Sequence, residues 1–351
     1  MSQRTEPTSQ RQNRPLQIGL IYPFDARDVR TWSGTPFFVK RALEKHVGDV
    51  TDLSPYPGAN RLMRLISAIC YRLGRPAPYD HLVPYAWKLG RYFSRRLRSL
   101  DLDCIVAPGG AEGVAWLQTD LPVILYSDAT WDLVVDYYRV YNNLLPGVKR
   151  SGEIVESRAL ERSALLLYSS QWAADSAIKH YGIPSDRVIV PYIGANLLDP
   201  PKKEEVLPRT MTTGVIRLLM VGVDWQNKGG SVARRVLEGL IERGYQATLT
   251  VAGCTVPDSE RHPAMEVVPF LNKSIPDQRA RFEELWRDAD LFILPSRFEA
   301  AGLVFCEASA YGLPIVAADT GGISSLVREG KNGYTIGHED EPEGYIERII
   351  G

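Results

Sequence analysis

Two carboxylates, Glu299 and Glu307, stand with seven residues between them, and their surroundings suggest what they do. The apolar run 291–294 predicts a buried strand leading into the first, and the second falls on the helix predicted to follow. The turn between them carries Gly302. A strand-to-helix turn of this kind points backbone N–H groups and the positive end of a helix dipole at one spot, which suits a phosphate. Two acidic side chains beside that spot suit the hydroxyls of a sugar.

A second candidate phosphate loop lies upstream. Gly222 ends the strand predicted at 217–221, and Lys228-Gly229-Gly230 opens the helix that follows. A lysine at this place would put a compact positive charge on a phosphate group. The sequence therefore predicts two strand-to-helix turns that serve one anionic ligand.

Taken in order, these motifs resemble the retaining glycosyltransferases of family 4, which have the GT-B fold. Glu299 and Glu307 match the E-x7-E signature of that family, and Lys228 with its glycines is similar to the family's donor-phosphate loop. Three further stretches follow in the family's order: ASAYGLPIVA at 308–317, Thr320-Gly321-Gly322 and Asn332-Gly333. The resemblance covers roughly residues 216–336 and is looser over the first 200.

The resemblance, together with the alternation of apolar strands and helices, predicts an α/β protein of GT-B type. We expect two Rossmann-like domains that face each other across a cleft. The expected parts are a disordered tail at 1–14, an N-terminal acceptor-side domain at 15–197, a linker at 198–214 and a C-terminal donor domain at 215–351. Relatives carry further helices beyond the Asn-Gly turn, so we expect a C-terminus that is truncated or lacks the closing helix.

The resemblance also implies a role for each donor-side residue. Glu299 would hold the transferred sugar, Glu307 would accept hydrogen bonds from the ribose, and Lys228 would neutralise the diphosphate. Backbone N–H groups at Gly222, Gly302, Leu303 and Val304 would bind the phosphate oxygens. Many relatives have a second basic residue where this chain has Val223.

The first half of the chain offers two more candidates. Gly34 follows the first predicted strand and resembles the family's glycine-rich loop, which lets the backbone approach the donor; an ordinary loop glycine is the alternative. Relatives commonly have a histidine after the strand that here ends at Tyr126, and this chain has Asp128 near that place. We interpret Asp128 as a catalytic candidate that touches a sugar hydroxyl or the reacting centre. A cap of the helix near Trp131 is the alternative.

The predicted activity is transfer of a sugar from a nucleotide-diphosphate sugar to an acceptor hydroxyl with retention of anomeric configuration. The resemblance implies no metal and no cofactor besides the donor. Two alternatives remain: a nucleotide-sugar 2-epimerase, which has the same fold, and a non-catalytic nucleotide-sugar-binding subunit. The missing histidine and Val223 would fit the second alternative. The donor base, the sugar and the acceptor stay open.

The amino-acid composition limits the classes of partner that the protein is expected to bind. The 41 Lys and Arg residues balance 42 Asp and Glu, so no global field favours nucleic acid. The four cysteines form no C-x-x-C pair, which suits free thiols in the cytoplasm, and no apolar run reaches the roughly 18 residues of a membrane span.

Residues 61–98 hold nine basic side chains against Asp80, with aromatic residues interleaved. The simplest interpretation of this stretch is a solvated helix face. Peripheral contact with the inner face of an anionic membrane, near a carbohydrate or lipid-linked acceptor, is the alternative.

Overall fold

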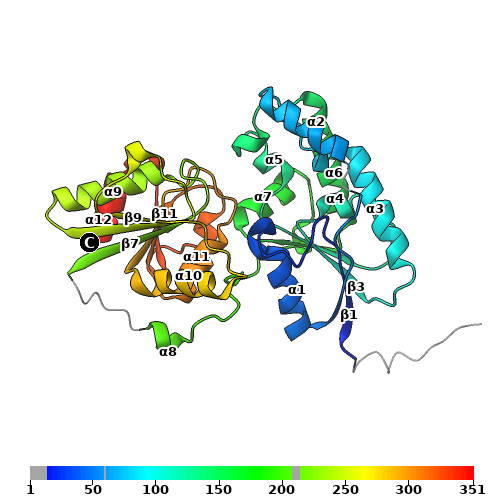
Figure 1. Cartoon of the computed structure of the whole chain (residues 1–351). Coiled ribbons are helices and arrows are strands. Elements are labelled where there is room, and N and C mark those ends of the chain that lie inside the picture. Colours follow the sequence, from blue (N-terminus) through cyan, green and yellow to red (C-terminus); the bar gives the residue numbers. More distant parts are fainter. Residues whose placement is uncertain (1–13, 59–60, 208–213) are drawn as a thin grey trace, which may run out of the picture. The chain divides into compact units, whose positions relative to one another are not determined.

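The computed structural model describes residues 14–58, 61–207 and 214–351, and its strands form two parallel six-stranded sheets (Figure 1). The chain divides into two compact units. The first contains the residues up to 126 and 144–166, and the second contains 127–143 and 167–351. Residues 1–13 of the predicted tail and 208–213 of the predicted linker lie outside the described residues, so the predicted domain boundaries stay a prediction.

The first sheet has the strand order β2-β1-β3-β4-β5-β6. Its strands are β1 (Leu16–Leu20), β2 (Gly48–Asp52), β3 (Cys104–Pro108), β4 (Val123–Ser127), β5 (Leu165–Tyr168) and β6 (Val188–Ile189). The order reverses between β1 and β3, and ligands of open parallel sheets bind beside such a reversal, at the carboxyl ends of the strands. The loop after β1 carries Gly34.

Helices cover the first sheet. Helix α1 (Thr35–His46) packs on β2 and β3, whereas α3 (Val83–Leu97), α4 (Ala111–Val114) and α6 (Pro146–Arg162) pack against one another (Figure 1). Helix α3 buries Tyr85, Leu89 and Phe93, which recur every fourth residue and form one face. A Cβ at Gly90 would lie 2.6 Å from the carbonyl carbon of Trp116, so the glycine allows α3 to approach that chain closely.

The remaining helices of the N-terminal half are shorter or less packed. They are α2 (Arg61–Arg72), α5 (Trp131–Val134), α7 (Gln171–Lys179) and α8 (Lys203–Val206), the last of which lies inside the predicted linker. None of the helices in the described parts of the chain combines the length and the apolar character needed to cross a bilayer.

The second sheet has the strand order β12-β11-β10-β7-β8-β9, which is the order of a Rossmann fold. Its strands are β7 (Val215–Val221), β8 (Gln246–Ala252), β9 (Met265–Val268), β10 (Leu291–Leu294), β11 (Ile315–Ala318) and β12 (Gly333–Ile336). The order reverses between β7 and β10. The predicted Lys228 loop follows β7 and the predicted Glu299 loop follows β10, so both lie at the reversal.

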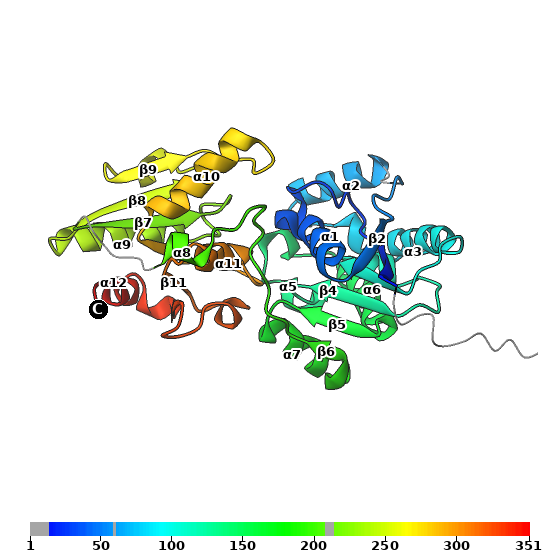
Figure 2. The same ribbon diagram turned by 90° about the horizontal axis from the view of Figure 1, so that it is seen from below.

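Two layers of helices enclose this sheet, as Figures 1 and 2 show. Helices α9 (Gly230–Glu242) and α12 (Glu343–Ile350) lie together on one face, and α10 (Pro276–Asp288) and α11 (Leu303–Ala310) lie on the other. The core centres on the fully buried Trp286, whose ring lies 5.2 Å from Phe292 and stacks on Tyr311 at 6.0 Å. A continuous core under α10 and α11 holds the β10–α11 turn in place.

Candidate functional site

The site begins with an ion pair between the two loops at the reversal of the second sheet. Lys228 Nζ contacts the Glu299 carboxylate, and these side chains are 18% and 11% exposed. The main chains of the loops are also joined, because the Arg297 N–H donates to the carbonyl of Asn227 at 2.8 Å. The lysine and the acid predicted to serve one ligand are therefore in direct contact.

Glycines make this close approach possible. Gly229 adopts a left-handed φ of 69°, and a Cβ there would lie 1.8 Å from the carbonyl oxygen of Pro295. A Cβ at Gly222 would lie 2.7 Å from Cγ of Lys228. A side chain at either position would push Lys228 away from Glu299 or separate the loops.

The N-terminus of helix α11 supplies backbone donors. Gly302 is its N-cap with a φ of 78°, and the cap residue makes no side-chain hydrogen bond to the first turn. The first turn, which contains Leu303 and Val304, carries no acidic side chain. The helix dipole and these N–H groups suit an anion here, because no carboxylate in the first turn of the helix competes for them.

A second lysine lies beside the second carboxylate. Glu307 is 5% exposed, and Lys273, from the segment between β9 and α10, places Nζ 2.5 Å from its carboxylate. Burial raises the pKa of Glu307, and the positive charge of Lys273 opposes that rise. The sequence predicted one cation for this site, and the structure adds Lys273.

The turn after β11 fixes the main chain of Glu299. Gly321 has a φ of 56°, and a Cβ there would lie 2.0 Å from the Glu299 carbonyl oxygen, which also accepts a hydrogen bond from the Gly322 N–H at 3.2 Å. The glycine pair that the sequence associated with the family thus has a physical reason, which is close backbone approach to the candidate sugar-binding acid.

Two tyrosines from the first half of the chain contact the same loop. The Glu299 N–H donates to Tyr137 Oη at 3.0 Å, and the Ala300 N–H donates to Tyr138 Oη at 2.7 Å. Tyr137 Oη also shares a hydrogen bond with Thr320 Oγ1 at 2.9 Å. The sequence did not single out either tyrosine, since the contacts join residues 162 positions apart.

Asp128 belongs to the second unit together with these tyrosines. Burial raises the pKa of Tyr138, and the negative charges of Glu299 and Asp128 raise it further. The charges of both predicted catalytic carboxylates therefore influence the pKa of the same phenol. The alternative in which Asp128 caps the nearby helix is not supported at the N-cap position, because Thr130 is the N-cap of α5.

Gly34 lies in the first unit, in an unusual stretch of backbone. It has a φ of 79°, and the two residues before it, Trp32 and Ser33, are also left-handed at 44° and 55°. A Cβ on Gly34 would lie 3.0 Å from the carbonyl oxygen of Val29. Three successive left-handed residues cost conformational energy and need support from the surrounding chain.

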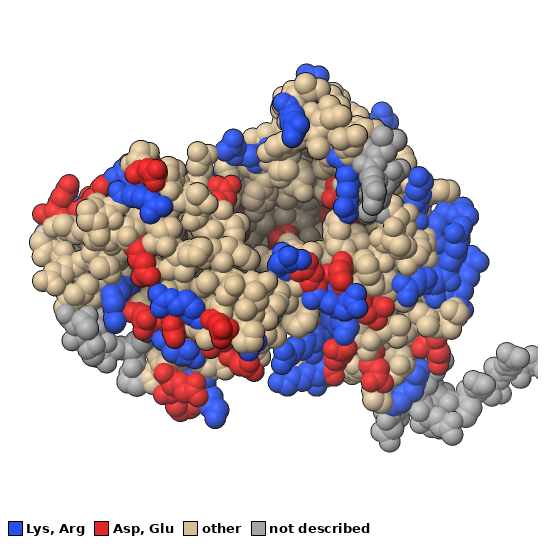
Figure 3. All heavy atoms as spheres, in the orientation of Figure 1, with Lys and Arg blue, Asp and Glu red and all other residues tan. Residues whose placement is uncertain are grey.

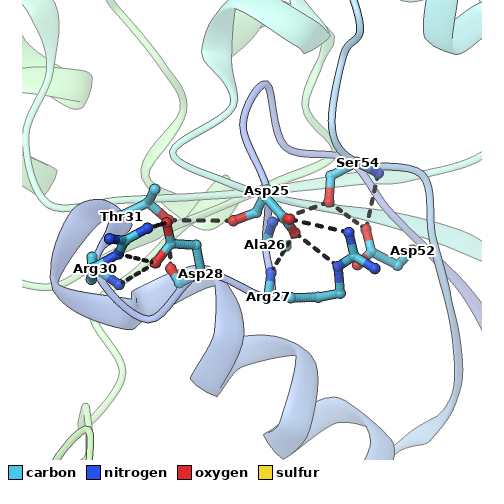
Figure 4. Close-up of polar contacts among 8 residues, drawn as sticks. All are labelled: Asp25, Ala26, Arg27, Asp28, Arg30, Thr31, Asp52 and Ser54. Carbon is cyan, nitrogen blue, oxygen red and sulfur yellow. Dashed lines mark hydrogen bonds and ion pairs between the residues drawn. The ribbon is translucent and has the colours of Figure 1, made fainter. Parts of the chain in front are cut away.

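Figure 4 shows this support in the preceding loop. Arg27 pairs with Asp25 and Arg30 pairs with Asp28, while Thr31 donates its hydroxyl to the Asp28 carbonyl at 2.8 Å. The loop is also tied to the chain beyond β2, since the Ala26 N–H donates to Ser54 Oγ, which itself donates to Asp52. These local contacts hold the residues that lead into the Gly34 turn.

A buried acid in the first unit was not predicted. Glu112 in α4 is 8% exposed, and its Oε1 lies 3.3 Å from Nδ1 of His81. Burial, with a contribution from the charge of Asp80, raises the pKa of Glu112 to about 8, and burial lowers the pKa of His81. This buried carboxyl group lies in α4, which follows β3 at the reversal of the first sheet.

Comparison with known proteins decides the family. The model of Glycosyltransferase Family 4 matches residues 39–197, and that of the glycosyl transferases group 1 matches residues 216–351. The chain belongs to the family 4 glycosyltransferases with the GT-B fold. The predicted family and the predicted GT-B fold are confirmed.

Individual relatives agree with this assignment. The D-inositol 3-phosphate glycosyltransferase of Corynebacterium efficiens is 28% identical over 248 residues, which cover 64% of this chain and 57% of the relative. That of Nocardia farcinica is 30% identical over 206 residues, covering 54% and 45%. The chain therefore spans about half the length of the curated relatives it matches.

Solved structures share the fold at low sequence identity. The lipopolysaccharide outer core galactosyltransferase WaaB superposes with a TM-score of 0.60 at 13% identity, covering 95% of this chain and 89% of that one. WaaG, a glycosyltransferase involved in lipopolysaccharide biosynthesis, gives 0.58 at 17% identity with the same coverage.

Proposed function

We propose that this protein transfers a sugar from a nucleotide-diphosphate sugar to an acceptor hydroxyl with retention of anomeric configuration, with no metal and no further cofactor. The observation that carries the proposal is the contact of Lys228 with Glu299 beside the N-terminus of α11, which Gly302 leaves without a side-chain cap. Membership of the family supports the proposal.

The chemistry of transfer explains why positive groups belong at this place. The bond from the anomeric carbon to the diphosphate oxygen breaks, the acceptor oxygen bonds to that carbon, and the acceptor proton passes to the leaving diphosphate. Negative charge grows on the diphosphate, so groups such as Lys228 and the Leu303 and Val304 amides stabilise the transition state more than the ground state. Loss of one such donor typically costs about 3 kcal/mol, or about two orders of magnitude in rate.

The ion pair gives Lys228 and Glu299 linked tasks. Glu299 is an acceptor of hydrogen bonds and is engaged by Lys228. A diphosphate bound at Lys228 would replace Glu299 as the partner of the lysine ammonium group. The Glu299 oxygens would then be available to accept hydrogen bonds from sugar hydroxyls. Donor binding would thereby orient the carboxylate, since the two partners of the pair serve opposite ends of the leaving bond.

The second ion pair suits the nucleoside end of the donor. Glu307 is buried on α11, and Lys273 favours its ionised form, which accepts hydrogen bonds from both hydroxyls of a ribose. A sugar nucleotide would therefore place its ribose at Glu307 and its hexose at Glu299, with the diphosphate at the start of α11 between them.

A binding screen followed by product analysis tests the proposal. UDP-, GDP-, ADP- and TDP-sugars should be compared by thermal shift, because a ligand that prefers the folded state raises the melting temperature. The donor that binds should then be incubated with and without acceptor sugars. Transfer that needs an acceptor supports the proposal. An epimerised donor formed without acceptor would identify a 2-epimerase, and binding without any turnover would identify a non-catalytic subunit.

We also propose that helix α2 brings the protein to an anionic membrane surface. Its exposed apolar residues are Leu65, Ile66 and Ile69, at 58%, 49% and 48%, and Leu73, directly after the helix, is 75% exposed. No acidic residue occurs between 61 and 79 in the sequence. In the view of Figure 3, the charged side chains over α2 are Lys and Arg. An apolar stripe flanked only by positive charge suits the boundary between anionic headgroups and acyl chains.

The structure also changes the interpretation of the aromatic residues in this stretch. Tyr85 and Phe93 are 3% and 0% exposed and belong to the core, whereas Tyr71 and Trp87 are 58% and 44% exposed. The sequence signal for membrane contact was a run of nine basic side chains with aromatic residues interleaved, and only some of those aromatic residues are exposed.

Vesicle sedimentation tests the membrane proposal. The wild-type protein should sediment with vesicles containing phosphatidylglycerol and remain in the supernatant with pure phosphatidylcholine. Leu65→Glu with Ile69→Glu should abolish sedimentation, and Ile241→Glu, at a 37% exposed position on α9, should not. Equal sedimentation of the α2 variant and the wild type would remove α2 from the proposal.

A further inference from the structure

The segment 127–143 belongs to the second unit, although the residues on either side of it, Tyr126 and Leu144, belong to the first. Asp136 and Asn143, which lie before and after Tyr137 and Tyr138, have left-handed φ angles of 60° and 56°. Such backbone is uncommon for residues other than glycine and persists where surrounding contacts impose it. The contacts of this segment indicate which part of the site it supports.

Two of its tyrosines, Tyr137 and Tyr138, contact the β10–α11 turn with both ring and hydroxyl. The Tyr137 ring lies 5.1 Å from Phe298 in an edge arrangement and 5.4 Å from Trp172. The Tyr138 ring lies 6.5 Å from Phe298. These rings hold Phe298, the residue directly before Glu299, while the hydroxyl groups accept the two backbone N–H groups that follow.

The hydroxyl groups of both tyrosines contact the main chain at Glu299 and Ala300, and Glu299 is the residue proposed to hold the sugar end of the donor. Glu299 and Ala300 are 8% and 3% exposed, so their N–H groups need partners within the protein. Tyr137 Oη and Tyr138 Oη accept them at 3.0 and 2.7 Å. The side chain of Glu299 is thus directed at Lys228 from a main chain that the tyrosines fix.

We propose that Tyr137 and Tyr138 are positioning residues for the sugar end of the donor, which they serve by holding the main chain of Glu299 and Ala300. This inference rests on the proposed function for its substrate. The tyrosines act through Glu299, and they leave the diphosphate and nucleoside ends at Lys228 and Glu307 to other residues. They therefore determine how well the sugar is held and not how well the nucleotide is held.

The surroundings of Tyr138 fit this role. Its phenol is neutral at physiological pH, since burial and the charges of Glu299 and Asp128 all raise its pKa. A neutral hydroxyl accepts the Ala300 N–H without adding charge beside the two carboxylates.

The test compares Tyr137→Phe, Tyr138→Phe and the double variant with the wild type. Tyr245→Phe is the matched control, because Tyr245 is 42% exposed and lies just before β8 at its amino end. Hydrogen–deuterium exchange of the peptide containing Glu299 and Ala300 reports on the main chain. Calorimetry with UDP-glucose and with UDP, or the matching pair of the base that binds, gives the sugar contribution as the ratio of the two dissociation constants.

We expect faster exchange at Glu299 and Ala300 in both tyrosine variants, and a sugar contribution that falls about tenfold while the affinity for the diphosphate stays within about twofold. Tyr245→Phe should match the wild type in both measurements. Unchanged exchange would overturn the inference whatever the ligand, and faster exchange with an unchanged ratio would reduce the tyrosines to structural residues. If the wild type binds no sugar nucleotide, that result refutes the proposed function itself. The role of the tyrosines at the sugar end is then refuted as well.

Discussion

Replacing Lys273 with methionine should expose the cost of burying the Glu307 charge. Methionine keeps most of the apolar length of the side chain and removes only the ammonium group. Breaking a fully buried ion pair costs about 3–5 kcal/mol, and breaking an exposed one costs about 0–1 kcal/mol. The Glu307 side chain is 6% exposed and that of Lys273 is 31% exposed, so the pair lies between these limits. We expect Lys273→Met to lower the free energy of unfolding by about 2 kcal/mol at pH 8.

The loss should depend on pH with a definite sign. Burial already raises the pKa of Glu307, and Lys273 opposes that rise, so its removal lets the pKa rise further. A carboxyl group whose pKa is raised by folding holds its proton in the folded protein after the unfolded chain has released it. Its contribution to stability therefore falls as pH rises from the unfolded pKa through the folded pKa. The deficit of Lys273→Met should be smallest near pH 5 and grow toward pH 8.

Urea unfolding of the wild type, Lys273→Met and Lys273→Arg at pH 5, 6, 7 and 8 measures this dependence. Lys273→Arg keeps the charge and should recover most of the lost stability. Lys331→Met, at an exposed position, controls for the loss of a lysine elsewhere. A deficit of the same size at every pH, or no deficit at all, would refute the assignment of Lys273 as the partner that opposes the rise in the Glu307 pKa.

Three further predictions concern the loops and the buried acid. Val223→Arg, at a position 69% exposed, should tighten nucleoside diphosphate binding about tenfold at low salt and lose that gain at high salt. A gain in affinity that does not depend on salt would contradict this prediction. Gly229→Ala should destabilise the protein by more than the ~1–2 kcal/mol that a left-handed alanine costs, because its Cβ would clash with Pro295. Gly330→Ala has open space around it and should cost only that amount, as measured by urea unfolding. Burial raises the pKa of Glu112 from 4.5 to about 8, so wild-type stability should fall relative to Glu112→Gln between pH 5 and 8, and parallel pH profiles would refute this.

Elements whose two faces are both buried were predictable from the sequence. Strand β10 was predicted at 291–294 and has those bounds, since its four apolar residues are shielded from water on both sides. Strand β9 was not predicted, because it lies at the edge of the sheet and its sequence, MEVV, includes an exposed Glu266. The stretch 61–98 was interpreted as a solvated helix face, and the structure has two helices there, α2 and α3, of which α3 buries one face in the core.

Some residues of the candidate site were predictable from the sequence and others were not. Lys228, Glu299 and Glu307 are close to strand ends and glycines, so local patterns place them at the reversal of the sheet. Lys273 and the two tyrosines reach the site from segments 34 and 162 residues away, and no local spacing records such contacts. The roles of all these residues stay predictions until ligands are tested.

Calorimetric titration of UDP, GDP, ADP and TDP into the wild type and into Glu307→Ala tests the central claim most directly. We expect one of these diphosphates to bind the wild type, and we expect Glu307→Ala to weaken that binding about tenfold or more by removing the acceptor for the ribose hydroxyls. Glu299→Ala should leave the affinity for the diphosphate nearly unchanged and suppress sugar transfer. Failure of every diphosphate to bind the wild type, or equal affinity in Glu307→Ala, would contradict a nucleotide-sugar site at the β10–α11 turn.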